Sequence, residues 1–169
     1  MATQHRDVRF TARQRQVIQL IAEGCSNEEI AERLGVTIHV GEEGGGYGVE
    51  ETAEVVEALH PDRIGHGILA AREPQLMAAL RERGIVLEIC PTSNLLTKAL
   101  ADEEAVRDTI RTFADRGVRF TIATDGPEMM HTHLSDELAL LYRVGALTAE
   151  ELRAVNGLGH EAAFLHRRV

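Results

Sequence analysis

"TIHVGE", residues 37–42, is the first of four short apolar segments that decide the fold of this chain. The others are "RIGHG" (63–67), "IVLEI" (85–89) and "VRFTIAT" (118–124), and amphipathic segments separate the four. Short β-branched runs that alternate with helical patterns are typical of parallel β/α units, in which a helix crosses over between neighbouring strands. The sequence therefore predicts an α/β fold with four parallel β/α units.

Side chains that can bind a metal or move a proton accompany these segments. His39 and Glu42 belong to the first segment, His66 to the second, and Asp125 follows the fourth. Loops at the carboxyl ends of parallel strands share one face of the fold, where binding and catalytic sites are built. We therefore expect these four side chains to converge.

The chemistry of these residue types suits a metal-assisted reaction. Zinc takes imidazole and carboxylate ligands, which makes His39 and Asp125 candidate ligands. Glu42 is suited to donate or accept a proton, and His66, which lies between two glycines, could steady a hydroxide or act as a base. Each residue also has a simpler interpretation: a histidine at a strand end can be structural, and "TDGP" around Asp125 is a turn sequence.

Four motifs in order carry a family resemblance. "TIHVGEEGG", "HPDRIGHG", "EICPTSN" and "TIATDGPEMM" resemble the second half of an adenosine deaminase, a zinc-dependent (β/α)8-barrel hydrolase of the amidohydrolase class. The resemblance covers residues 36–169 and implies half of such a barrel. It implies that His39 and Asp125 are zinc ligands, that Glu42 donates a proton to the purine ring nitrogen, and that His66 orients the attacking hydroxide.

The chain also departs from the family pattern. The family carries a His-x-His pair on its first barrel strand, which supplies two zinc ligands and is not among these motifs. Gly126 stands where the family usually has a second aspartate that faces the purine. His131 and His133, in "HTH" after the fourth segment, are candidate substitute ligands, although they can equally begin a helix. We therefore expect an incomplete zinc site within one chain and impaired turnover.

Residues 1–35 have a different character. "TARQ" (11–14) and "SNEE" (26–29) are capping boxes, which predict the starts of two short amphipathic helices. Residues 10–37 are similar to the first two helices of the DNA-binding domain of LuxR-type regulators. The recognition helix of that family does not follow, and nothing forms a basic surface, so we do not expect nucleic acid binding.

Composition limits the remaining possibilities. A chain of 169 residues with 44% hydrophobic content can bury one ordinary core, and its net charge of −9 comes from residues after 35. The two cysteines are far apart, which argues against a disulfide framework or a cysteine zinc site and favours the cytoplasm. No stretch approaches the roughly 20 apolar residues that cross a bilayer, so no membrane partner is expected.

The sequence leaves three functional readings. The first is an adenosine-deaminase-like, zinc-dependent hydrolase of a purine nucleoside or related amine, formed by residues 36–169 and closed into a barrel as a homodimer. The second is a folded half-barrel protein without catalytic activity. The third is a DNA-binding regulator based on the LuxR-like helical pair of residues 1–35.

Overall fold

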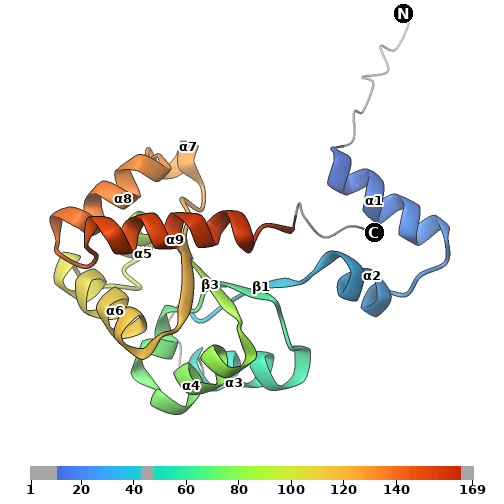
Figure 1. The fold of residues 1–169 in the computed structure, drawn as a ribbon, viewed down its shortest axis with the longest axis horizontal. Helices are drawn as coiled ribbons and strands as arrows, with labels where there is room; N and C mark the ends of the chain where they lie inside the picture. The colour runs from blue at the N-terminus through green and yellow to red at the C-terminus, as the bar shows by residue number, and fades with distance from the viewer. Residues whose placement is uncertain (1–10, 43–47, 165–169) are drawn as a thin grey trace, which may run out of the picture. The chain divides into compact units, whose positions relative to one another are not determined.

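The computed structural model describes residues 11–42 and 48–164 (Figure 1). Contacts divide the chain into two compact units, of which one contains the N-terminal helices and the other spans Thr37–Ala163. The glycines that follow Glu42 in the first motif lie outside the described residues. Among the described residues, no helix combines the length and the apolar character that a membrane crossing requires.

Two helices form the N-terminal unit, α1 (Ala12–Ala22) and α2 (Asn27–Leu34). Both begin with the predicted capping box, in which the N-cap side chain and the residue three positions later exchange hydrogen bonds with each other's backbone. The capping pairs are Thr11 with Gln14 and Ser26 with Glu29. The predicted helical pair is therefore present.

The larger unit contains one sheet with the strand order β1-β2-β3-β4. The strands are β1 (Thr37–Val40), β2 (Arg63–His66), β3 (Val86–Ile89) and β4 (Arg119–Ile122). Every neighbouring pair is parallel. The prediction of an α/β fold with four parallel β/α units is therefore confirmed, and the architecture corresponds to part of a (β/α)8 barrel.

Helices connect the strands and follow the last one. They are α3 (Gly48–Leu59), α4 (Pro74–Arg83), α5 (Pro91–Leu96), α6 (Glu103–Arg116), α7 (Pro127–Met130), α8 (Leu134–Arg143) and α9 (Ala149–Glu161), with a 3₁₀ helix, η1 (Ile68–Arg72), after β2. Local signals set their ends: α6 begins where the Asp102 carboxylate accepts the Ala105 N–H at 2.9 Å, and it stops at Gly117, where φ is +67°.

The two faces of the sheet differ in chemistry. One row of neighbouring positions consists of Ile38, Ile64, Leu87 and Phe120. This row joins the hydrophobic core, which also includes side chains of α3, α4 and α6. The next row consists of His39, Gly65, Glu88 and Thr121. Because side chains alternate along a strand, this second, more polar row lies on the face opposite the core.

Candidate active site

A cavity of about 380 Å³ lies on the polar face of the sheet, towards the carboxyl ends of the strands. His39, His66 and Asp125 all line it, together with Glu88 and Cys90. These residues come from β1, β2, β3 and the segment after β4, so the sheet brings side chains that are up to 86 positions apart (from 39 to 125) to one place. This is the arrangement expected of strand ends in a β/α fold.

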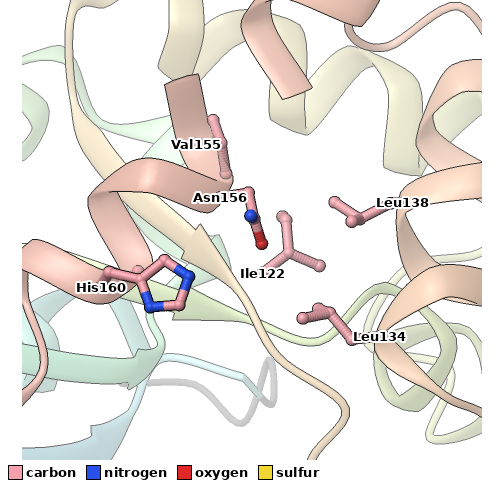
Figure 2. Close-up of a pocket in the computed structure, with 7 residues that line it drawn as sticks. Ile122, Leu134, Leu138, Val155, Asn156 and His160 are labelled. Atoms are coloured by element: carbon pink, nitrogen blue, oxygen red, sulfur yellow. The ribbon is translucent and has the colours of Figure 1, made fainter. Parts of the chain in front are cut away.

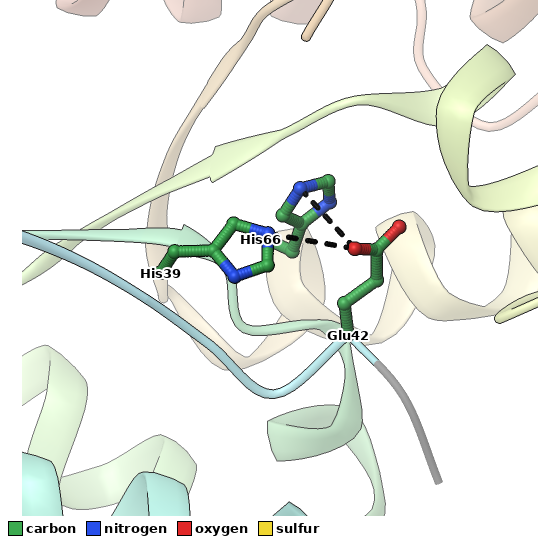
Figure 3. Close-up of side chains that lie close together, drawn as sticks. All are labelled: His39, Glu42 and His66. Atoms are coloured by element: carbon green, nitrogen blue, oxygen red, sulfur yellow. Dashed lines mark ion pairs between the residues drawn. The ribbon is translucent and has the colours of Figure 1, made fainter. Parts of the chain in front are cut away.

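His39, Glu42 and His66 form the centre of the site (Figure 3). Glu42 Oε2 lies 3.5 Å from Nε2 of His39 and also 3.5 Å from Nε2 of His66. The two imidazole rings meet edge to face with their centroids 4.7 Å apart. The His39 side chain is 68% exposed, whereas those of Glu42 and His66 are only 10% and 3% exposed. The carboxylate therefore stands between one imidazole open to solvent and one in the interior.

The segment after β3 supplies hydrogen-bond donors to this centre. Asn94 Nδ2 donates to Glu42 Oε1 at 3.1 Å, and Thr97 Oγ1 donates to the same oxygen, also at 3.1 Å. Asn94 Nδ2 also lies 2.9 Å from His66 Nδ1. One oxygen of Glu42 thus faces the imidazoles, while the other is held by α5 and the residue that caps its end.

Asp125 is held from the same segment. The Ser93 hydroxyl donates to Asp125 Oδ2 at 2.8 Å, and Ser93 itself is fully buried. Both Asp125 and His66 adopt left-handed backbone conformations, with φ of 59° and 60°. This conformation costs a residue other than glycine about 1–2 kcal/mol, and such residues concentrate at functional sites. The two candidate residues therefore share an uncommon backbone conformation.

Burial sets the charge states of two groups in the cavity. Removal from solvent lowers the pKa of His66, so its imidazole is neutral at neutral pH. Burial also raises the pKa of the Cys90 thiol to about 12. Cys90 therefore stays a thiol and is a poor metal ligand, because metals bind the thiolate.

The donor set fits a borderline metal ion. The ligand atoms of His39, Glu42 and His66 lie within 4.8 Å of one another, and Asp125 lines the same cavity. Imidazole nitrogens and carboxylate oxygens are the ligands that zinc takes in catalytic sites. The side chains closest to one another are His39, Glu42 and His66, whereas the ligand pair expected from the sequence was His39 and Asp125. The roles assigned to the individual residues remain predictions.

His131 and His133 lie apart from this group. His131 ends α7 with a left-handed backbone (φ 48°), and His133 is the N-cap of α8, where its N–H donates to Asp136 Oδ2 at 2.9 Å. Among the described residues, the side chains grouped closely enough to share a metal ion do not include either histidine. That His131 and His133 act as substitute metal ligands stays a prediction.

The sequence predicts no role for Ser93, Asn94 or Thr97. Ser93 and Asn94 belong to the motif "EICPTSN", one of the four that carry the family resemblance. A usable signal was the position of these residues just after a strand end, at the start of a helix that begins with Pro91. Which groups they contact depends on the packing of three separate strand ends, and no local pattern gives that.

A second cavity, of about 230 Å³, lies between β4, α8 and α9 (Figure 2). Ile122, Leu138 and Val155 give it a largely aliphatic lining, and His160 and Asn156 lie at its side. Among the described residues that line this cavity, His160 is the one with a titratable side chain.

Comparisons with known proteins agree with the fold and the motifs. A family model described as adenosine deaminase matches residues 19–169. An adenine deaminase of Rhizobium rhizogenes is 39% identical over 132 residues, which cover 78% of this chain and 39% of that protein. An aminodeoxyfutalosine deaminase of Acidothermus cellulolyticus is 44% identical over 116 residues, which cover 66% of this chain and 32% of that protein.

Solved structures show the same relationship. An amidohydrolase from Burkholderia ambifaria with bound zinc superimposes with a TM-score of 0.69 at 28% identity, covering 82% of this chain and 38% of that one. The N6-methyl-AMP deaminase from Arabidopsis thaliana gives a TM-score of 0.69 at 25% identity, with 82% of this chain and 39% of that one covered. The chain spans less than two fifths of the length of these relatives. Because the family model matches most of the chain, including all four strands, the chain belongs to the adenosine deaminase family.

Proposed function

We propose that this chain carries the metal-binding and proton-transfer residues of a hydrolytic deaminase that acts on a purine nucleoside or a related amine. The observation that carries the proposal is the convergence of His39, Glu42 and His66 at strand ends, around a cavity that Asp125 also lines. This set contains ligands for a metal and two groups able to move a proton, which hydrolytic replacement of an amino group requires.

Each residue has a separate role in the proposed reaction. His39 and Asp125 hold the metal ion, which, when bound, supplies Lewis-acid activation of water at neutral pH. Glu42, with one carboxylate oxygen directed to the imidazoles, transfers a proton to the ring nitrogen of the substrate. His66, neutral because it is buried, orients the attacking water through a ring nitrogen.

The names of the relatives support the substrate class. The similar proteins are named adenine deaminase and aminodeoxyfutalosine deaminase, and the solved structures include an N6-methyl-AMP deaminase. A substrate with an amino-substituted purine is common to the first and the last of these names. Gly126, in place of the aspartate usual in the family, leaves the choice among such substrates to be tested.

The sequence also left two alternative functions. A catalytically silent half-barrel protein would keep the strand-end turns without binding metal. A DNA-binding role for the LuxR-like pair of residues 1–35 rests only on the sequence resemblance, and the adenosine deaminase match itself begins at residue 19, inside α1. We therefore favour the deaminase proposal.

The decisive experiment is elemental analysis of protein purified without chelator, combined with assays on adenine and adenosine. We expect bound zinc in the wild type and a fall of about 10-fold or more in zinc affinity for His39→Ala and Asp125→Ala, since even supporting residues cost about 10–100-fold. Glu42→Gln should retain zinc and lower turnover by about 10²–10⁴-fold, the usual contribution of acid–base catalysis.

Matched variants distinguish the alternatives. His160→Ala removes an exposed histidine of α9 outside the site and should leave zinc content unchanged. A loss of zinc in His131→Ala or His133→Ala would favour the substitute ligands. Equal zinc content in the wild type, His39→Ala and Asp125→Ala would overturn the assignment, and a wild type without zinc even after zinc is added would favour the silent protein.

A further inference from the structure

Asn94 occupies the middle of the candidate site without any role in the proposed reaction. It belongs to α5, after β3, and its side chain is fully buried. Its amide nitrogen lies 3.1 Å from Glu42 Oε1 and 2.9 Å from His66 Nδ1, and these two residues come from the ends of two other strands. One side chain therefore joins three of the four strand ends that build the site.

The donor and acceptor properties of these groups restrict the proton positions. An ionised carboxylate only accepts hydrogen bonds, and Glu42 Oε1 already accepts one from the Thr97 hydroxyl at 3.1 Å. The amide group that faces it is therefore the NH₂, which has two N–H bonds to donate. The second N–H points to His66 Nδ1, which must then be the unprotonated nitrogen of the ring.

We propose that Asn94 is a positioning residue that holds His66 in the tautomer with its proton on Nε2 and holds the Glu42 carboxylate between the two imidazoles. In this arrangement His66 directs Nε2 towards Glu42 Oε2, at a distance of 3.5 Å. Asn94 donates one N–H to Glu42 Oε1 and the other to His66 Nδ1, and in this way it fixes the positions of both side chains.

The side-chain oxygen of Asn94 also bears on which way its amide group is turned. Asn94 Oδ1 is buried and has no hydrogen-bond partner among the described residues. A rotated amide would place this oxygen against Glu42, and two acceptors would face each other unless Glu42 carried a proton. That alternative would also place the His66 proton on Nδ1. The tautomer of His66 therefore reports which of the two arrangements exists.

The arrangement has a consequence for catalysis, which rests on the proposed function. Asn94 engages Glu42 Oε1 and His66 Nδ1, so Glu42 Oε2 and His66 Nε2 are the atoms of these two residues that can act on the substrate and the attacking water. The tautomer itself does not depend on whether the protein is a deaminase.

Long-range ¹H–¹⁵N correlation spectra of the full chain labelled with ¹⁵N-histidine test this proposal directly. Spectra are recorded well above the ordinary histidine pKa of about 6.5, and His66→Gln identifies the His66 signals. We expect the pattern of a protonated Nε2 and an unprotonated Nδ1. A proton on Nδ1 of His66 in the wild type would overturn the proposal, and this outcome is measured whether or not any variant folds.

Two variants isolate the contribution of Asn94. Asn94→Leu removes both donors and should leave His66 with a mixture of tautomers. Thr97→Val removes the other donor to Glu42 Oε1 without touching His66, so its tautomer should stay as in the wild type. An unchanged tautomer in a folded Asn94→Leu protein would show that Asn94 does not hold the ring.

Kinetics separate this proposal from the proposed function. If the chain deaminates adenine or adenosine, Asn94→Leu should lower kcat by about 10–100-fold with little change in KM, as expected for a residue that orients catalytic groups. A protein with the expected tautomer and without deaminase activity would contradict the proposed function alone. An active protein with the His66 proton on Nδ1 would contradict the role of Asn94 alone.

Discussion

Single residues decide how the chain turns from β2 into the site. Gly67 follows His66, has φ of +65°, and its N–H donates to the Val40 carbonyl at 3.0 Å. A Cβ at this position would lie 2.8 Å from Leu87 Cδ2 and 3.1 Å from Ile64 Cγ2. Glycine is therefore required here for its backbone conformation and for the close packing of the core beneath the site.

Gly67→Ala should lower the free energy of unfolding by about 2–5 kcal/mol, because a left-handed backbone with a Cβ costs about 1–2 kcal/mol and overpacking about 1–3 kcal/mol. Gly65→Ala is the matched control. Gly65 is not left-handed, and its Cβ would meet its nearest neighbour, His39 Cα, at 3.4 Å, an ordinary contact. Urea denaturation measures the free energy of unfolding of both variants. Equal losses of stability in the two would contradict this account of Gly67.

At the scale of elements, a buried carboxylate joins helices that follow different strands. Glu137 of α8 is fully buried. Its Oε2 accepts the Thr92 N–H of α5 at 3.0 Å, and its Oε1 accepts the Thr132 hydroxyl at 2.9 Å. Because α5 also carries Asn94, Glu137 helps to fix the segment that contacts the candidate site.

Glu137→Leu should lower the free energy of unfolding by at least about 1–3 kcal/mol, since it leaves the Thr92 N–H unpaired and the Thr132 hydroxyl with only its 3.5 Å contact to the His133 carbonyl. Thr132→Val removes one of these donors. In the double variant the loss should be smaller than the sum of the two single losses, because fewer donors remain unpaired. Thermal and urea unfolding of the wild type, the two single variants and the double variant measure these losses. If the loss in the double variant equals the sum of the two single losses, the proposed contact between Glu137 and Thr132 is contradicted.

At the scale of the whole molecule, the sheet has two outer strands. Among residues 37–42 and 48–164, β1 pairs only with β2 and β4 only with β3. The core covers one face, and α9 approaches the other at β4, where a Cβ on Gly159 would lie 4.0 Å from Thr121 Cγ2. Backbone groups along open strand edges favour pairing with another strand.

We expect two copies of the chain to associate through these edges, so light scattering should give a mass near twice 18.6 kDa. Thr37→Lys adds a charge at an exposed position of β1 and should shift the protein towards the single-chain mass, because charged side chains on edge strands oppose pairing. Ala101→Lys, in an exposed loop, serves as the control. A single-chain mass for the wild type across a wide concentration range would contradict self-association.

The family and the convergence of the candidate residues at the strand ends followed from the sequence, whereas the geometry of the contacts among them did not. His39, Glu42, His66 and Asp125 were recognised because each accompanies a strand segment in a known order of motifs. The contact of one Glu42 oxygen with both imidazoles was not predicted, and neither were the donors on α5.

The sequence by itself determined the elements: the four strands, the capped helices α1 and α2, and the order in which reactive residues follow the strands. Those features depend on β-branched runs, capping residues and glycines, which act over a few neighbouring positions. Only the tertiary structure decided which side chains meet. Asn94 contacts residues 52 and 28 positions away, and such contacts depend on strand register and on how the strand ends pack together.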